Sequence, residues 1–339
     1  MTTDTAAVRN YTLIRGDSPV VISLPHVGTL LPGELQPQLT ATARTLPDTD
    51  WHVDQLYDFA FESGYTVLRA LHSRYLIDLN RPPDDAPLYP GSNTSGLCPV
   101  LDFAGAPIWE CGTEPVAPGE VARRLRLYWE PYHAELAACV AAAHARHGYA
   151  LLIDGHSIRS HVPRLFTGRL PDINIGTAGG TACSTDLRMR VQELLFAQGR
   201  FTHVLDGRFK GGHITRHFGR PALRQHAVQL EMCWSTYMQE SPPYAVDPAR
   251  AAQLVPVLRT LVQALLNWTP DVVEDRQQQL TEDLQRAEVF EIWCKPTRKR
   301  WWIVKGYPKA LRVDDDPYGL TDFFPQPPDV AVKIGRAHV

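Results

Sequence analysis

The chain has 339 residues, of which 44% are hydrophobic and 21% charged, and its formal net charge at pH 7 is -3. This composition is typical of a globular protein with a substantial buried core. A charge so close to neutrality argues against nucleic acid and membrane surfaces as partners, because both are bound by clustered basic residues. Small polar molecules remain as candidate partners.

The cysteines and the N-terminal segment indicate a cytoplasmic protein. The six cysteines are scattered and form no C-x-x-C pair, which argues against a cysteine-ligated zinc and against a disulfide framework. Free thiols are typical of the reducing cytoplasm. Residues 1–10 lack the apolar stretch of a signal peptide, and no segment approaches the roughly 20 apolar residues of a membrane span.

Predicted strands and helices alternate through the first 270 residues. In chain order we expect a strand at 20–24, a helical segment at 53–63, strands at 66–71 and 75–79, a helix at 119–147, a strand at 149–153, a helix at 187–198, strands at 202–205 and 227–232, and a helix at 248–267. Two long segments rich in proline and glycine, 82–118 and 157–184, interrupt them, and loops of that length are usually functional. The alternation predicts an α/β domain.

The C-terminal part differs from the rest in composition. We expect one domain over 1–270 and an extension of unknown role over 271–332. The extension is a small added unit, a read-through into neighbouring sequence, or an artefact together with the end of the chain. Within it, 277–285 is typical of a charged helix or linker, and 289–304 of a β-hairpin. The last seven residues, 333–339, resemble the translation of a sequencing adapter and are left out of the fold prediction.

Four apolar, strand-like segments run directly into polar residues. They lead into His26, into Asp78-Leu79-Asn80-Arg81, into Asp154 and His156, and into Glu231. In open α/β sheets, ligands bind beyond the carboxyl ends of the strands, where the loops diverge and expose side chains. Two histidines, carboxylates and an Asn-Arg pair at one edge therefore predict a hydrolytic metal site.

His26 and His156 are the candidate metal ligands at these strand ends. A hydrolytic zinc takes about three protein ligands from His, Asp and Glu and keeps one position for water. A single histidine at a strand end is more often structural, with its ring bonded to the backbone. Two histidines at equivalent strand ends favour a metal.

The third ligand is expected to be Asp50 or Asp54, in the segment that enters the first helix. Asp48 or Asp50 could instead cap that helix, which is the common role of Asp before an apolar periodic run. If both were helical, Asp50 and Asp54 would lie on the same helix face. We take Asp50 as the ligand and Asp54 as a residue that orients a ligand.

Two further carboxylates are candidates for chemistry. Asp154 precedes His156 by two residues, so in a strand both side chains point to one face, and Asp154 could accept the second N–H of that imidazole. Its alternative role is a buried carboxylate bonded to loop amides. Glu231, between Leu230 and Met232, is a candidate general base whose pKa desolvation would raise. Its alternative is an exposed glutamate at a strand end.

Arginines are candidates for binding a carboxylate of the substrate. Asn80-Arg81 and Arg216 offer guanidinium groups, which bind carboxylates bidentately. Arg216 alone carries little weight, because arginine is common on protein surfaces.

Together these segments resemble the N-formylglutamate amidohydrolase (deformylase) family of histidine degradation. The matching stretches are LPHVGT at 24–29, DTDWHVDQLY at 48–57, IDLNRP at 77–82, DGHSIRS at 154–160, PRLF at 163–166, LPDINIGT at 170–177, GGHITRHFGRP at 211–221 and QLEM at 229–232. The resemblance covers about residues 10–268. It implies a three-layer α/β fold, a mixed sheet flanked by helices, similar to that of the zinc carboxypeptidases and aspartoacylases.

The resemblance also implies an activity, the hydrolysis of N-formyl-L-glutamate to formate and glutamate. Zinc, or another divalent metal, would be held by His26, Asp50 and His156, with Glu231 moving the proton. Arg81 with Asn80 would bind the α-carboxylate, and Arg216 or Arg159 the side-chain carboxylate. Two residues depart from the pattern. Thr29 stands where a carboxypeptidase has the Glu of His-x-x-Glu, so the identity of the carboxylate ligand stays open. His213 stands where the family usually has another aromatic residue.

Two other functions remain as alternatives. A related hydrolase would act on another N-acyl amino acid or on a γ-glutamyl amide, since the sequence does not reveal the depth of the pocket. A non-catalytic protein that binds acidic metabolites is the third possibility, and it predicts binding without turnover.

Overall fold

The computed structural model describes residues 9–88, 91, 93–113 and 116–270, together with three strands at 289–294, 299–304 and 311–312. The chain divides into two compact units, Met1–Thr269 and Pro270–Val339. No helix among these residues combines the length and the apolar character needed to span a membrane.

The first unit is built on a mixed seven-stranded sheet in the order β1-β3-β2-β4-β7-β5-β6. Its strands are β1 (Tyr11–Ile14), β2 (Val20–Leu24), β3 (Thr66–Ala70), β4 (Ala150–Ile158), β5 (Ile173–Gly176), β6 (His203–Leu205) and β7 (Gln225–Cys233). The central strands β3, β2, β4 and β7 are parallel, whereas β1 and β5 pair antiparallel with their neighbours β3 and β7. Both β2 and β4 are buried along their whole length, as expected for parallel strands covered on both faces.

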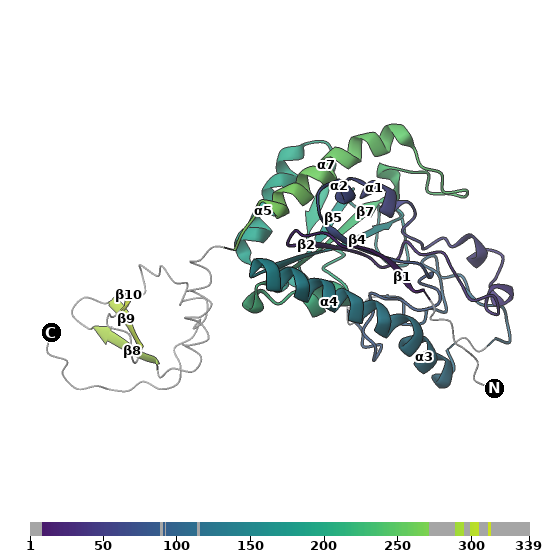
Figure 1. The fold of residues 1–339 in the computed structure, drawn as a ribbon, viewed down its shortest axis with the longest axis horizontal. Coiled ribbons are helices and arrows are strands. Elements are labelled where there is room, and N and C mark those ends of the chain that lie inside the picture. The colour runs from purple at the N-terminus through teal and green to yellow at the C-terminus, as the bar shows by residue number, and fades with distance from the viewer. Residues whose placement is uncertain are drawn as a thin grey trace. The chain divides into compact units, whose positions relative to one another are not determined.

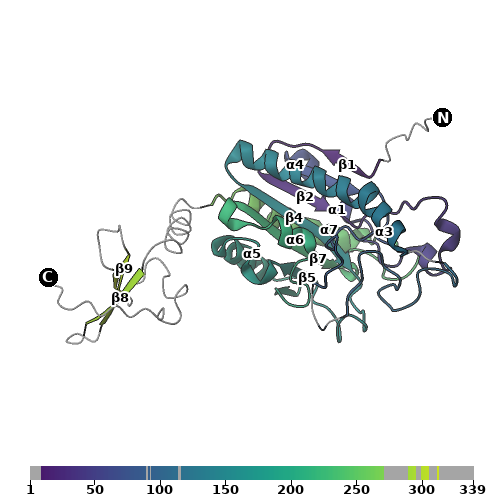
Figure 2. The same ribbon diagram turned by 90° about the horizontal axis from the view of Figure 1, so that it is seen from below.

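Helices cover both faces of this sheet (Figure 1). They are α1 (Val53–Leu56), α2 (Phe59–Glu62), α3 (Pro118–Arg124), α4 (Glu130–His147), α5 (Thr185–Gln198), α6 (His213–Phe218) and α7 (Pro248–Leu266), with a π-helical turn at Leu125–Trp129 between α3 and α4. Ile22 of β2 packs in a core with α1, α2, α5 and α7, while its neighbour Val21 packs in a second core with α4 and α6. Figure 2 shows α4 lying along the strands that it contacts. The predicted three-layer α/β fold is confirmed.

Several predicted elements differ from the structure. Residues 75–79 form a buried turn and not a strand, because their backbone bonds to loops, as in the 2.7 Å bond from Asp78 N–H to the Leu97 carbonyl. The predicted helix at 53–63 is two short helices, and the strands β1 and β5 were not predicted. Strands β4 and β7 extend further than predicted, so His156 lies within β4 and not beyond it, while Glu231 lies within β7 as predicted.

The second unit contains the strands β8 (Val289–Cys294), β9 (Lys299–Val304) and β10 (Leu311–Arg312), in the order β10-β9-β8. β8 and β9 pair antiparallel over the residues for which the sequence predicts a hairpin. The predicted helix or linker at 277–285 and the adapter-like segment 333–339 lie outside the described residues.

Candidate functional site

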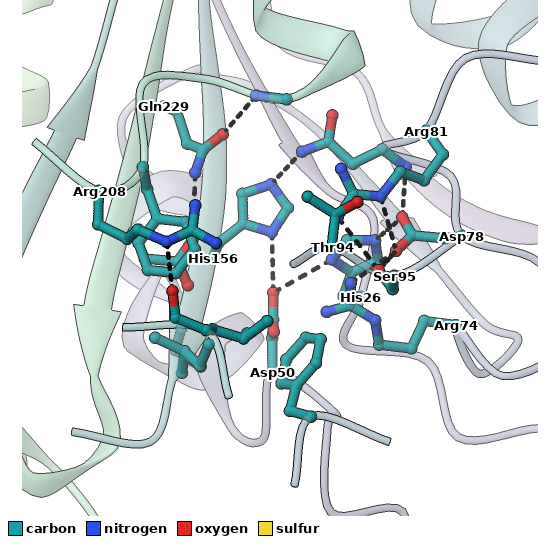
Figure 3. Close-up of a pocket in the computed structure, with 18 of the residues that line it drawn as sticks. His26, Asp50, Arg74, Asp78, Arg81, Thr94, Ser95, His156, Arg208 and Gln229 are labelled. Atoms are coloured by element: carbon teal, nitrogen blue, oxygen red, sulfur yellow. Dashed lines mark hydrogen bonds and ion pairs between the residues drawn. The ribbon is translucent and has the colours of Figure 1, made fainter. Parts of the chain in front are cut away.

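Three buried side chains from separate segments meet at the edge of the sheet: His26 just after β2, Asp50 before α1, and His156 on β4 (Figure 3). Their candidate ligand atoms all lie within 4.8 Å of one another. Asp50 Oδ2 is 3.0 Å from His156 Nδ1 and 3.8 Å from His26 Nδ1. A backbone bond of 3.0 Å from Asp50 N–H to the His26 carbonyl ties the two segments together. The carboxylate in this cluster is thus Asp50.

The cluster has the properties of a divalent-metal site. His26 Nδ1 and Asp50 Oδ1 are buried and have no hydrogen-bond partner among the described residues. Unpaired buried polar atoms are costly and often mark an ion. Two imidazole nitrogens and a carboxylate are also the ligand types of a hydrolytic zinc. These residues therefore fit a metal ion.

Each histidine of the cluster contacts a second carboxylate with its other ring nitrogen. His26 Nε2 is 2.7 Å from Asp78 Oδ1, and His156 Nε2 is 3.0 Å from Asp154 Oδ1. A carboxylate at Nε2 fixes the orientation of the ring and directs Nδ1 towards the centre of the cluster. Burial lowers the pKa of His156, but Asp154 and Asp50 outweigh burial and hold that pKa well above its usual value.

Glu231 lines the same pocket from β7, in register with His156 on the neighbouring strand β4. Its carboxylate is buried, and burial raises its pKa to about 8, against the opposing effect of His156. Gln229 Nε2 donates a hydrogen bond of 3.1 Å to Glu231 Oε2 and so fixes the carboxylate. A buried carboxylate with a pKa near neutrality can exchange protons at physiological pH.

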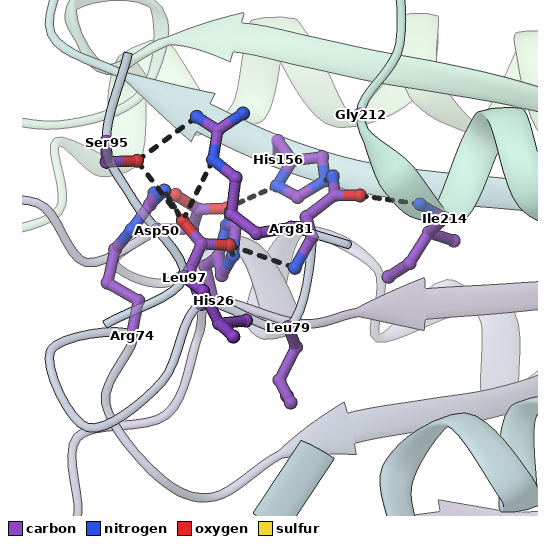
Figure 4. A network of polar contacts seen from close by, with 12 residues as sticks. His26, Asp50, Arg74, Leu79, Arg81, Ser95, Leu97, His156, Gly212 and Ile214 are labelled. Carbon is purple, nitrogen blue, oxygen red and sulfur yellow. Dashed lines mark hydrogen bonds and ion pairs between the residues drawn. The ribbon is translucent and has the colours of Figure 1, made fainter. Parts of the chain in front are cut away.

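Asn80 and Arg81 both line the pocket. Figure 4 shows Arg81 beside Ser95. The amide of Asn80 is engaged by the protein: its Oδ1 accepts a bond of 2.8 Å from Ile214 N–H, and its Nδ2 donates to Asp154 at 3.0 Å. Nδ2 also lies 2.8 Å from His156 Nε2. Arg81 Nη2 donates to Ser95 Oγ at 3.1 Å. Asn80 thus holds the wall of the pocket, and Arg81 presents a positive charge to it.

Three predicted site residues lie elsewhere. Asp54 forms an ion pair of 3.1 Å with Arg69 and is not part of the cluster. Asp50 and Asp54 do not share a helix face, because Asp50 lies before the helix and the chain turns at His52, which has a φ of 61°. Arg216 is exposed on α6 and its Nε donates to the Gly211 carbonyl at 3.0 Å.

Arg159 lies 3.5 Å from Asp48 Oδ1 and 5.9 Å from the centre of the Trp234 ring. Within the described part of the chain, the residues that line the pocket include none of Asp54, Arg159 and Arg216. The structure therefore does not bring these three residues together with the His26–Asp50–His156 cluster.

The sequence did not assign roles to several residues that the structure brings into the pocket. Asp78 is fully buried, and it contacts His26 and accepts a hydrogen bond of 2.6 Å from Arg74 Nη2. Burial raises the pKa of Asp78, but Arg74 and His26 outweigh burial and hold that pKa well below its usual value. Arg74, Arg208 and Gln229 also line the pocket. Asp78 lies in the stretch IDLNRP at 77–82 together with Asn80, and this is the one sequence signal that marks it; no such signal marks Arg74.

Comparisons with known proteins show what the chain is similar to. The family model of N-formylglutamate amidohydrolase matches residues 18–238. An N-formylglutamate deformylase of Pseudomonas putida is 49% identical over 257 residues, covering 75% of this chain and 94% of that protein. One of Pseudomonas aeruginosa is 49% identical over 254 residues, covering 75% of this chain and 95% of that protein.

A solved structure gives the same result at the level of the fold. The N-formylglutamate amidohydrolase from Ralstonia eutropha JMP134 superposes with a TM-score of 0.64 at 28% identity, over 76% of this chain and 99% of that one. Residues 18–238, which the family model matches, contain every strand of the seven-stranded sheet except the edge strand β1. They also contain all three residues of the His26–Asp50–His156 cluster. The chain belongs to the N-formylglutamate amidohydrolase family.

Proposed function

We propose that this protein hydrolyses N-formyl-L-glutamate to formate and L-glutamate. The observation that carries the proposal is the buried His26–Asp50–His156 cluster beside Glu231, in a chain 49% identical to two N-formylglutamate deformylases. We propose zinc as the metal of this cluster, because two imidazole nitrogens and one carboxylate are a common catalytic zinc set. When bound, zinc would supply a Lewis acid and lower the pKa of water.

Glu231 is the proposed general base. With a pKa of about 8, the Glu231 carboxyl group is present in both its deprotonated and its protonated form near physiological pH, so it can act first as a base and then as an acid. The carboxylate takes a proton from the attacking water and returns it to the amide nitrogen as the C–N bond breaks. Gln229 holds one carboxylate oxygen by its 3.1 Å bond, so the group stays fixed through both proton transfers.

The remaining pocket residues bind and orient. Asp78 and Asp154 hold the two histidine rings, and Asn80 ties Asp154 to the backbone of α6 at Ile214. Arg81 is the proposed partner of the α-carboxylate, because a guanidinium at the pocket wall can bind a carboxylate through two N–H groups.

The test combines a formate-release assay with elemental analysis of the purified protein. We expect about one zinc per chain, and activity that is lost on chelation and regained with zinc. Glu231→Gln should lower kcat by about 100-fold or more while leaving the metal content unchanged. Glu193→Gln, an exposed glutamate on α5, is the matched control and should leave kcat unchanged. Near wild-type turnover by Glu231→Gln, or full activity without metal, contradicts the mechanism.

The substrate range separates this function from its alternatives. N-formylglutamate should be turned over faster than N-acetylglutamate, N-formylaspartate and γ-glutamyl amides. A preference for one of these would assign the chain to a related hydrolase, and tight binding of glutamate without turnover would make it a binding protein.

We further propose that the reaction belongs to histidine degradation in the cytoplasm, with residues 1–270 as the catalytic domain and 271–332 as an extension. The free cysteines among the described residues support the location, since thiols persist in a reducing compartment. The boundary between the two compact units, after Thr269, supports the division. Retained formate release by a chain that ends at residue 270 would support a catalytic domain that acts alone.

A further inference from the structure

Residues 76–81 carry three side chains of the pocket wall, Asp78, Asn80 and Arg81, but they do not belong to the sheet. Residues 76–80 are buried, so their backbone carbonyls need hydrogen-bond partners that a neighbouring strand does not supply. The groups that bond these carbonyls therefore decide where this wall of the pocket lies.

Three side chains from the helical stretch between the start of α3 and the middle of α4 each bond one backbone carbonyl of this segment. The bonds run from Arg124 Nη1 to the Leu76 carbonyl at 2.9 Å, from Trp129 Nε1 to the Arg81 carbonyl at 3.0 Å, and from His133 Nε2 to the Leu79 carbonyl at 2.8 Å. A carbonyl oxygen only accepts, so His133 carries a proton on Nε2. One helical stretch thus holds this wall of the pocket at three points.

The π-helical turn at Leu125–Trp129 allows these donors to reach the same segment. Glu130 N–H bonds the Leu125 carbonyl five residues back, so this turn is wider than a turn of α-helix. In a regular α-helix, residues four apart share a face, whereas residues five apart are rotated by about 140° from each other. Arg124 and Trp129 are five residues apart in the sequence, and the wider turn offsets this rotation.

Trp129 is the donor that bonds Arg81 itself. Its ring stacks on His133, with 3.7 Å between the ring centroids and 20° between the ring planes, so the indole N–H has a fixed direction. The Arg81 guanidinium contacts other groups of the wall: Nη2 donates to Ser95 Oγ at 3.1 Å, and Nε is 3.9 Å from Asp78 Oδ2. Where this guanidinium lies in the pocket depends on where the Arg81 backbone is held.

We infer that Trp129 is a positioning residue whose indole N–H holds the Arg81 backbone, so that the Arg81 guanidinium meets the α-carboxylate of the substrate. The inference rests on the proposed function, in which Arg81 binds that carboxylate. Trp129 is not among the described residues that line the pocket, so it acts on substrate binding only through Arg81. Removal of its N–H leaves the Arg81 carbonyl without this partner, and the loss of one such bond changes an equilibrium by about tenfold.

The test is a double-mutant cycle on the full chain, with Trp129→Phe and Arg81→Met assayed singly and together. Phenylalanine keeps a ring that can stack on His133 and lacks the N–H. Trp129→Phe should raise KM for N-formylglutamate about tenfold while kcat changes by less than about twofold. In the Arg81→Met background, Trp129→Phe should change kcat/KM by less than about twofold, because a residue that acts through Arg81 has no separate effect once the guanidinium is gone.

A second substrate and a matched variant separate positioning from a general loss of stability. N-formyl-γ-aminobutyrate, which is N-formylglutamate without the α-carboxylate, should have the same KM in Trp129→Phe as in the wild type. Trp109→Phe is the control, because Trp109 Nε1 donates to the Pro99 carbonyl at 2.9 Å and Trp109 is not among the described residues that line the pocket. This control should lower the thermal midpoint and leave KM for N-formylglutamate unchanged.

The outcomes distinguish this inference from the proposed function. An unchanged KM in Trp129→Phe, an equal rise in KM for both substrates, or additive losses in the cycle overturn the assignment of Trp129 and leave the proposed hydrolysis standing. A wild-type KM in Arg81→Met overturns the assignment as well. A wild-type chain that releases no formate from N-formylglutamate overturns the proposed function itself, and the assignment with it.

Discussion

Replacing Asp78 by Asn tests whether the buried charge pair behind His26 supports both the fold and the proposed metal site. Asp78 Oδ1 lies 2.7 Å from His26 Nε2, and Oδ2 accepts a bond of 2.6 Å from Arg74. The side chains of Asp78 and Arg74 are 1% and 8% exposed. Asn has nearly the same volume as Asp, so the substitution removes the charge and leaves the packing in place.

Two effects of known size follow. Arg74 loses the buried carboxylate that it hydrogen-bonds, and removing one member of a buried pair lowers the free energy of unfolding by about 3–5 kcal/mol. His26 loses the anionic acceptor at Nε2, which orients its ring and makes Nδ1 a stronger ligand. Loss of such a partner lowers metal affinity by about 10–100-fold. The structure therefore predicts both a less stable metal-free protein and weaker zinc binding from one substitution.

The assays are urea unfolding of the chelator-treated protein and competition for zinc with a chromophoric chelator. Asp54→Asn is the matched control: it breaks the 3.1 Å pair with Arg69, whose two side chains are 30% and 31% exposed. Half-exposed pairs contribute about 0–1 kcal/mol, so this variant should keep nearly all its stability and its zinc affinity. The reasoning is refuted if Asp78→Asn binds zinc within about twofold of the wild type, or loses no more stability than Asp54→Asn.

Three further changes have definite expected results. Gln229→Met, which removes the 3.1 Å bond to Glu231 Oε2, should lower kcat by about tenfold with KM unchanged in steady-state assays, whereas Gln225→Met at the start of the same strand should have no effect. Gly212→Ala should lower the thermal midpoint and the activity together, because a Cβ there would lie 2.5 Å from the Asn80 amide; wild-type values in both assays would contradict this. Burial lowers the pKa of His133 to about 3, so the unfolded chain takes up a proton that the folded chain does not. This contribution to stability is complete above pH of about 6.5 and should fall by about 2 kcal/mol between pH of about 7.5 and 5. Urea unfolding across pH checks it, and His133→Gln should flatten the slope.

The layered fold could be predicted because buried parallel strands are continuous apolar runs, as in β2 and the first half of β4. The strands that escaped prediction lack this signal. β1 is a short, partly exposed edge strand, and β5 has four residues between Pro171 and Thr177 in a segment rich in turn-forming residues. The strand that was wrongly predicted at 75–79 has the same origin. Hydrophobicity reports burial, and this buried segment is covered by loops without pairing in the sheet.

Some residues of the candidate site could likewise be predicted from the sequence, and others could not. His26, His156 and Glu231 could be found because each follows or interrupts an apolar run on a central strand. Arg74 and Arg208 could not, because their positions depend on contacts with distant segments. Arg208 and Arg216 are eight residues apart, and only the turn into α6 decides that the first faces the pocket and the second the solvent. Such choices depend on tertiary packing, which a local pattern does not contain.

Two residues proposed for the reaction lie on strands of the sheet, whereas the arginines at the pocket wall lie outside the strands. His156 and Glu231 stand on adjacent parallel strands in direct register, and Asp154 and Gln229 form the pair two residues earlier in the same register. Neighbouring strands are about 4.8 Å apart, so the distance between the proposed metal ligand His156 and the proposed base Glu231 is set by the sheet itself. Arg81 and Arg208 lie outside its strands, and Arg208 is held by the carbonyls of two long loops. Changes in those loops should therefore alter which N-acyl amino acid is bound while the His26–Asp50–His156 cluster and Glu231 keep their geometry.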